Sequence, residues 1–312
     1  MPAFDAVTPR ASTTPVNQIL SVKPVVLSVP GRGDDLQVRV TAPTDGIDLP
    51  VIVFAHGFGL AMDSYDPLVD FWAANGFVVV QPTFLDSLTL GLTPADPRYP
   101  NIWRTRVEDI ERVLDDLGTV VAAVPGLADR VDRNRLAVAG HSWGGQSVGM
   151  LLGARVVGAD GQPGADATDA RVKAGVLLAT TGIGWQNLTP FAQENFAFMS
   201  PDFAQLNTPT LVVAGDQDQS LLSTRGPDWF TDVYTLSPGA QSLVTLFGGE
   251  HSLGGIHGYK ATDTTDESPE RVDLVRRTST AFLKKALNID GAAWDEVTAG
   301  AATEPAGRID SK

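Results

Sequence analysis

Short β-rich apolar runs alternate with amphipathic helical stretches through most of this chain of 312 residues. Such alternation predicts an α/β fold with a mostly parallel sheet covered by helices on both faces. The first two runs flank a Gly-rich turn and predict an antiparallel hairpin. The predicted strands are 25–29, 36–41, 51–54, 77–80, 136–139, 176–178, 210–214 and 243–247. The predicted helices are 67–75, 101–117, 142–154 and a last one that begins after the capping residue Ser268 and runs to about 287.

No linker or internal repeat divides the chain, so a single domain over residues 19–287 is predicted. Residues 1–18 are expected to form a flexible segment. Residues 288–312, rich in Ala, Gly, Asp and Glu, are expected to form a mobile tail. The irregular stretch 182–207 is too aromatic for disorder, and we expect it to be a cap or a pocket wall.

The net charge of −14 makes nucleic acid an improbable partner, because phosphate binding needs a basic face. The absence of cysteine excludes a disulfide framework and a thiol nucleophile. The start of the chain lacks the apolar core of a secretion signal, and no apolar run reaches membrane-spanning length. The sequence therefore predicts a cytoplasmic protein without membrane insertion, and leaves the oligomeric state open.

The segment Gly140-His141-Ser142-Trp143-Gly144-Gly145 lies between a predicted strand and a predicted apolar helix. A serine on such a sharp turn is exposed above the helix N-terminus, where negative charge is favoured. The neighbouring glycines avoid collisions with the strand and the helix. This placement predicts that Ser142 is a catalytic nucleophile.

A serine nucleophile needs a general base and an acid that orients the base. His251 follows the last predicted strand and is the preferred base, with His257 as the alternative. Asp218 lies three residues after the glycine that ends the strand 210–214, the usual spacing for the acid, and Asp216 is its alternative. The order Ser142, Asp218, His251 is the chain order of α/β hydrolases.

The tetrahedral intermediate needs two N–H donors directed at its oxyanion. The backbone N–H groups of Trp143, after the nucleophile, and of Phe58, in the loop after the strand 51–54, are the candidates. His56 in that loop is expected to anchor it. Phe58 and Trp143 are also candidate walls of an apolar substrate pocket. The other predicted pocket residues are Leu60, Trp185, Phe191 and Trp103, while Arg98, Arg104 and Arg106 are expected on a solvated surface.

Over about residues 25–287 the chain resembles the α/β-hydrolase superfamily. The loop 56–59, the step 75–79 and the segment 140–145 look like the chlorophyllase and cutinase-like branch, with platelet-activating-factor acetylhydrolases and dienelactone hydrolases as similar neighbours. The resemblance implies an ester hydrolase without cofactor or metal. Plant chlorophyllases usually have Arg, and polyester-degrading cutinases Met, where this chain has Trp143, which argues against chlorophyll and polyesters as substrates.

The predicted function is a serine carboxylic-ester hydrolase that acts on small hydrophobic esters through an acyl-enzyme. The same triad serves thioester, amide, polyester or perhydrolase chemistry, so these alternatives stay open. A binding protein on a hydrolase scaffold is a further alternative, although such proteins usually lack a triad member.

Overall fold

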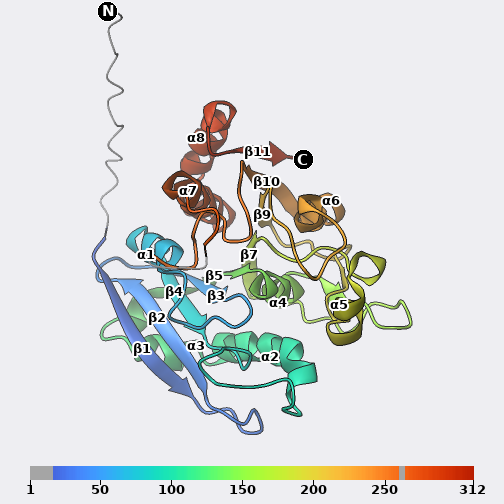
Figure 1. Cartoon of the computed structure of the whole chain (residues 1–312). Coiled ribbons are helices and arrows are strands. Elements are labelled where there is room, and N and C mark those ends of the chain that lie inside the picture. The colour runs from blue at the N-terminus through green and yellow to red at the C-terminus, as the bar shows by residue number, and fades with distance from the viewer. Residues whose placement is uncertain (1–16, 260–263) are drawn as a thin grey trace, which may run out of the picture.

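The computed structural model describes residues 17–259 and 264–312. In this part of the chain, nine strands form one sheet in the order β1-β2-β4-β3-β5-β7-β9-β10-β11 (Figure 1). Their bounds are β1 (Ile19–Leu27), β2 (Leu36–Pro43), β3 (Leu49–Ala55), β4 (Val78–Pro82), β5 (Val131–His141), β7 (Val172–Leu178), β9 (Thr210–Gly215), β10 (Ala240–Leu246) and β11 (Gly307–Ser311). The predicted flexible segment 1–18 lies almost entirely outside the described residues.

The six central strands, from β4 to β10 in the sheet order, are parallel to one another. The hairpin of β1 and β2 is antiparallel and also pairs antiparallel with β4. This mostly parallel sheet with an N-terminal hairpin is the predicted α/β-hydrolase fold. Two short strands, β6 (Arg155–Val156) and β8 (Pro201–Asp202), pair separately.

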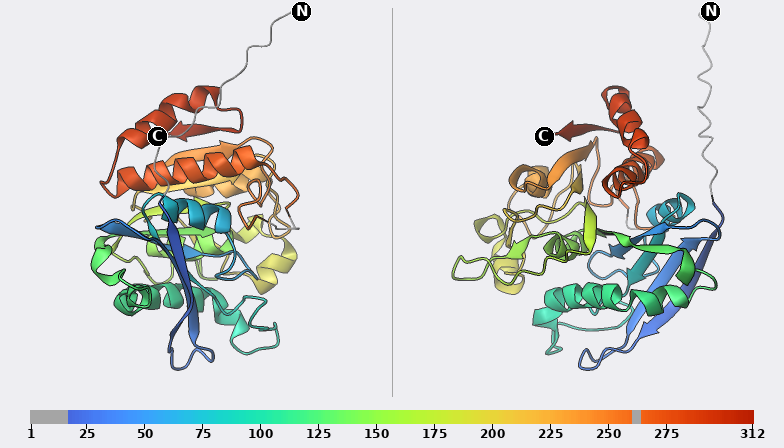
Figure 2. Two further views of the ribbon diagram at one scale, coloured as in Figure 1. Left: turned by 90° about the vertical axis from the view of Figure 1, so that its left-hand side faces the viewer. Right: turned by 180° about the vertical axis from the view of Figure 1, so that it is seen from behind.

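Helices cover both faces of the sheet. Figures 1 and 2 show α1 and α7 side by side on one face and α2 and α4 on the other. The helices are α1 (Asp66–Ala74), α2 (Ile102–Asp115), α3 (Leu117–Ala122), α4 (Trp143–Leu151), α5 (Pro190–Asn195), α6 (Asp232–Leu236), α7 (Pro269–Ala286) and α8 (Ala292–Gly300). Because both faces are covered, every residue of β3 and of β4 is buried, which explains the apolar runs at residues 49–55 and 78–80.

Helix α7 begins where the sequence predicts. The hydroxyl of Ser268 accepts a hydrogen bond from the N–H of Arg271 at 3.3 Å, and Pro269 is the first helical residue. The proline lacks only an N–H that would have no partner inside the helix, so the two residues together fix the start of the helix.

The prediction of a mobile tail over residues 288–312 is wrong. Helix α8 packs on α7 through Trp294, whose ring lies 5.5 Å from that of Phe282, and β11 pairs antiparallel with β10. The predicted last strand, 243–247, is therefore followed by another one. A nine-residue helix with a single buried aromatic and a polar edge strand give little periodic signal, because only one side of each element is buried.

Candidate active site

Ser142 lies at the sharp turn between β5 and α4, with backbone angles φ 56° and ψ −123°. A residue other than glycine rarely adopts such angles, and they persist only where the surroundings hold them. The turn also requires glycine on both sides. A Cβ on Gly140 would lie 2.4 Å from Gly144, and a Cβ on Gly144 would lie 2.0 Å from the carbonyl oxygen of Ala55.

The structure brings Ser142, His251 and Asp218 into one hydrogen-bonded chain. The Ser142 hydroxyl lies 2.9 Å from Nε2 of His251, and Nδ1 of His251 lies 3.0 and 3.1 Å from the two carboxylate oxygens of Asp218. The Asp218 side chain is fully buried, and burial raises the pKa of its carboxyl above the ordinary value despite the opposing effect of His251. This geometry allows His251 to take a proton from the serine and Asp218 to orient the imidazole.

The two alternative residues lie elsewhere. Asp216 accepts a hydrogen bond from the N–H of Gly248 at 2.8 Å, so it ties the loop after β9 to the loop that carries His251. The ring of His257 packs 5.4 Å from Tyr65 and 4.9 Å from His141. Neither residue occupies the place of Asp218 or His251 beside Ser142.

Asp266 holds the loop of His251, a role that the sequence did not indicate. One of its carboxylate oxygens accepts hydrogen bonds from the N–H groups of Glu250 and Gly254 at 2.8 and 2.9 Å. Its acidic neighbourhood has the composition of a solvated stretch, yet Asp266 is buried. Two backbone bonds from one carboxylate restrict the loop on both sides of His251.

His141 lies behind the nucleophile and is buried. Its Nδ1 atom is 2.9 Å from the Tyr65 hydroxyl, and Nε2 is 2.8 Å from the carbonyl oxygen of His251. The Nε2–H group therefore donates to that carbonyl. Burial, together with the neighbouring histidines, holds the pKa of His141 well below its usual value. His141 is thus a neutral support for the backbone of His251.

His56 anchors the loop after β3 on the other side of Ser142. Nδ1 of His56 bonds to the carbonyl oxygen of Gly57 at 2.7 Å, and Nε2 accepts the N–H of Phe84 at 3.1 Å. The N–H of Gly57 donates to the Tyr65 hydroxyl at 3.0 Å. Burial, and then the neighbouring Arg106, lower the pKa of His56 to about 4, so the imidazole is neutral at pH 7.

The three arginines expected on a solvated surface differ from one another. Arg104 is exposed, and Arg98 is partly exposed in ion pairs with Asp34 and Asp96. The expectation is wrong for Arg106, which is 1% exposed. The periodicity of the helix indicates that Arg106 is buried. It comes four residues after the buried Ile102, which places it on the apolar face of α2.

A cavity of about 330 Å³ opens beside Ser142 and His251. Its other lining residues are Phe58, Trp143, Thr181, Phe196, Met199, Ser220, Leu221, Leu222, Trp229 and Phe230. Two of these, Phe196 and Met199, come from the stretch 182–207. The ring centroids of Phe58 and Trp143 lie 4.6 Å apart. The side chains of the two candidate oxyanion donors therefore form one continuous wall of the cavity.

The four other predicted pocket residues, Leu60, Trp185, Phe191 and Trp103, do not line this cavity. Phe191 packs behind the lining residue Phe196, with the rings 5.7 Å apart. Trp103 stacks on Phe198 at 5.8 Å. Sequence reasoning missed most of the lining because it comes from segments, such as 220–222 and 229–230, that only the folded chain brings together.

The comparison with protein families agrees with this architecture. The family model for chlorophyllase matches residues 33–155, which include the loop after β3, the strand β5 and the turn at Ser142. Over these residues the chain is similar to chlorophyllases, and its mostly parallel sheet with an N-terminal hairpin is an α/β-hydrolase fold. The match indicates a hydrolase of ester bonds. Among curated proteins, no sequence matches this chain.

Within residues 17–259 and 264–312, no helix combines the length and hydropathy needed to cross a bilayer. In the same part of the chain, no three His, Asp or Glu side chains are grouped as metal ligands would be. The cellular compartment stays a prediction from the sequence.

Proposed function

We propose that the protein is a serine carboxylic-ester hydrolase that works through an acyl-enzyme. His251 removes the proton from the Ser142 hydroxyl as the oxygen attacks the ester carbonyl. Asp218 keeps the Nδ1–H tautomer of His251 and stabilises the imidazolium that forms. The protonated His251 then gives the proton to the leaving alcohol. Water attacks the acyl-enzyme in the second half of the cycle with the same base, and the acid product leaves.

The oxyanion of each tetrahedral intermediate would be bound by the backbone N–H groups of Phe58 and Trp143. Both residues also contribute side chains to the cavity. The cavity is lined mainly by apolar groups, and about 330 Å³ is at the lower end of the volume of small-molecule sites. We therefore expect esters with a hydrophobic acyl or alcohol group of short to medium length.

The observation that carries the proposal is the unbroken chain from the Ser142 hydroxyl through His251 to Asp218, with distances of 2.9 and 3.0 Å. It coincides with the left-handed backbone of Ser142 at the N-terminus of α4. A solvent-facing serine in a Gly-rich turn would need neither the strained backbone nor a histidine oriented by a buried carboxylate.

The proposal is tested by hydrolysis of p-nitrophenyl esters across acyl lengths, with Ser142→Ala as the control, and by a fluorophosphonate label located by mass spectrometry. We expect labelling at Ser142, turnover that the variant loses, and an optimum at short to medium acyl chains. A folded protein that neither reacts with the label nor hydrolyses any ester would contradict the proposal and favour a binding role. Preference for a thioester or an amide at equal acyl length would instead replace the ester by that substrate class.

A further inference from the structure

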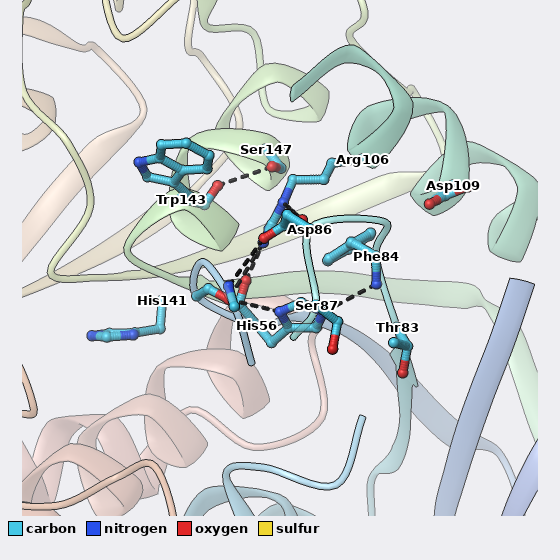
Figure 3. Close-up of polar contacts among 12 residues, drawn as sticks. His56, Thr83, Phe84, Asp86, Ser87, Arg106, Asp109, His141, Trp143 and Ser147 are labelled. Atoms are coloured by element: carbon cyan, nitrogen blue, oxygen red, sulfur yellow. Dashed lines mark hydrogen bonds and ion pairs between the residues drawn. The ribbon is translucent and has the colours of Figure 1, made fainter. Parts of the chain in front are cut away.

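A buried ion pair lies beneath the loop that carries Phe58. The side chains of Arg106, on α2, and Asp86, in the loop after β4, are 1% and 0% exposed. They form two parallel hydrogen bonds, Nε to Oδ1 at 2.8 Å and Nη2 to Oδ2 at 2.7 Å (Figure 3). Removing two charges from water is costly, and apolar residues of the same volume often fill such a site equally well. Its hydrogen bonds with the backbone are therefore expected to serve a function other than filling the core.

The ion pair forms hydrogen bonds with three backbone groups of the loop after β3. Arg106 donates from Nη1 to the carbonyl oxygen of His56 at 2.9 Å and from Nη2 to that of Gly57 at 3.4 Å. Asp86 accepts the N–H of Gly59 through Oδ2 at 3.1 Å. Figure 3 shows the pair next to His56, with the ring of Phe84 beside the guanidinium.

These bonds fix both peptide groups that flank Phe58. The carbonyl of Gly57 and the N–H of Phe58 belong to one planar trans peptide and point in opposite directions. When Arg106 holds that carbonyl, it also sets the direction of the Phe58 N–H, away from the ion pair. The carbonyl of Phe58 and the N–H of Gly59 belong to the next peptide, which Asp86 holds. The orientation of the proposed oxyanion donor thus depends on both partners.

We propose that Arg106 and Asp86 are positioning residues for acyl transfer, which keep the Phe58 N–H directed at the oxyanion that forms on Ser142. The inference rests on the proposed function. Neither side chain lines the cavity beside Ser142, so we expect their effect to fall on the transition state and not on substrate binding. Loss of an oxyanion donor lowers turnover by about 10²–10³-fold. Because His56 also holds the Gly57 carbonyl, we expect loss of the guanidinium fork to lower kcat by about 10- to 100-fold.

The chain contains a matched control on the same helix. Arg32 and Asp109, the latter on α2, form a second bidentate pair at 2.7 and 2.9 Å, and both side chains are 2% exposed. The other donors of Arg32 reach the carbonyl oxygens of Asp34 and Thr83. This pair therefore has the same chemistry and burial as Arg106 with Asp86. Its further hydrogen bonds go to Asp34, in the turn after β1, and to Thr83, in the loop after β4, and not to the loop after β3 that carries Phe58.

The experiment compares Arg106→Lys with Arg32→Lys in the full chain. Lysine keeps the charge but cannot hold a carboxylate and two carbonyls with one fork. The measurements are the melting temperature, kcat and KM on p-nitrophenyl butyrate, and inhibition by phenylboronic acid, whose tetrahedral adduct on Ser142 presents an oxygen to the oxyanion donors. We expect both variants to lose stability. Only Arg106→Lys should lower kcat by 10- to 100-fold with KM within about 2-fold, and weaken the boronate by a similar factor.

Equal kcat values for the two variants, or a boronate affinity unchanged in Arg106→Lys, would overturn the inference and leave the ion pair a purely structural role. If Arg106→Lys does not fold, Asp86→Asn serves in its place and should show the same split between kcat and KM. Failure of the proposed function is distinguished beforehand, because the wild-type protein would then not be labelled by a fluorophosphonate. In that case a crystal structure of Arg106→Lys with an unmoved Gly57–Phe58 peptide would contradict the positioning role by itself.

Discussion

The two sides of Ser142 are held by different means. On one side, the His251 side chain contacts Ser142 and the Asp218 side chain orients His251. Asp216, Asp266 and His141 hold the loop of His251 through hydrogen bonds to its backbone. On the other side, the loop after β3 presents backbone groups, and a buried ion pair holds it from below. A side-chain donor depends on residue identity at its own position, whereas a backbone donor depends on the groups that fix its peptide.

The largest expected effect falls on the side-chain partners of Ser142. Asp218→Asn should lower kcat by about 10⁴-fold, because the amide favours the wrong tautomer of His251. Asp216→Asn is the matched control, since it lies two residues away and bonds to backbone, and it should change kcat by less than about 10-fold. Steady-state kinetics on p-nitrophenyl butyrate check both variants. Equal losses in the two would mean that the assignment of the acid is wrong.

A destabilising substitution far from Ser142 tests whether a loss of global stability is enough to lower turnover. Trp294→Ala removes the 6%-exposed indole that packs α8 on α7, and should cost about 3–5 kcal/mol of the free energy of unfolding. Urea unfolding measures this cost, and kcat at a temperature where the variant is folded should stay within about 2-fold. A large fall in kcat would show that the site depends on the C-terminal elements.

His56, the first residue of the loop after β3, makes the stability of the fold depend on pH. The pKa of His56 is about 4 in the folded chain and about 6.5 when it is unfolded, so the unfolded state binds the extra proton between these values. Stability should be fully present above pH 6.5 and fall by about 3 kcal/mol as the pH drops to 4. Urea unfolding between pH 4.5 and 7.5 measures the slope, which His56→Gln should reduce. An unchanged slope in this variant would exclude His56 as the cause.

The smallest effect is expected from the side chain of Phe58. Since its proposed role is carried by the N–H group, Phe58→Ala should keep kcat within about 3-fold. KM should rise by a few-fold, because the ring lines the cavity and contacts Trp143. Kinetics on a series of acyl lengths separate the two parameters. A loss of kcat as large as that of Arg106→Lys, with KM unchanged, would show that the ring itself orients the loop.

The same contrast explains how far sequence reasoning could go. The central strands and the turn at Ser142 follow from local patterns, as does the candidate role of Asp218, because each signal lies within a few residues of chain. Arg106 and Asp86 are 20 residues apart in sequence and hold a loop about 30 to 50 residues before them. Their pairing becomes visible only when the fold brings α2 next to the loop after β4, and their contacts with the loop after β3 only when that loop lies beside both. The helix period alone could have indicated that Arg106 is buried.

The pocket and the C-terminal edge were missed for related reasons. The lining of the cavity comes from Phe58, from Trp143 and from segments between residues 181 and 230, so no single stretch reveals it. Strand β11 is polar because it forms the edge of the sheet, and such a strand carries little apolar alternation. The composition of residues 288–312 is therefore similar to that of a mobile tail.

The proposed mechanism requires an acyl-enzyme on Ser142. The direct measurement is mass spectrometry of the protein after acid quenching during turnover of p-nitrophenyl butyrate, followed by peptide mapping. We expect a butyryl adduct on the peptide that contains Ser142, which Ser142→Ala lacks and which Asp218→Asn forms more slowly. Turnover without any adduct on Ser142, or turnover that survives in Ser142→Ala, would contradict this mechanism.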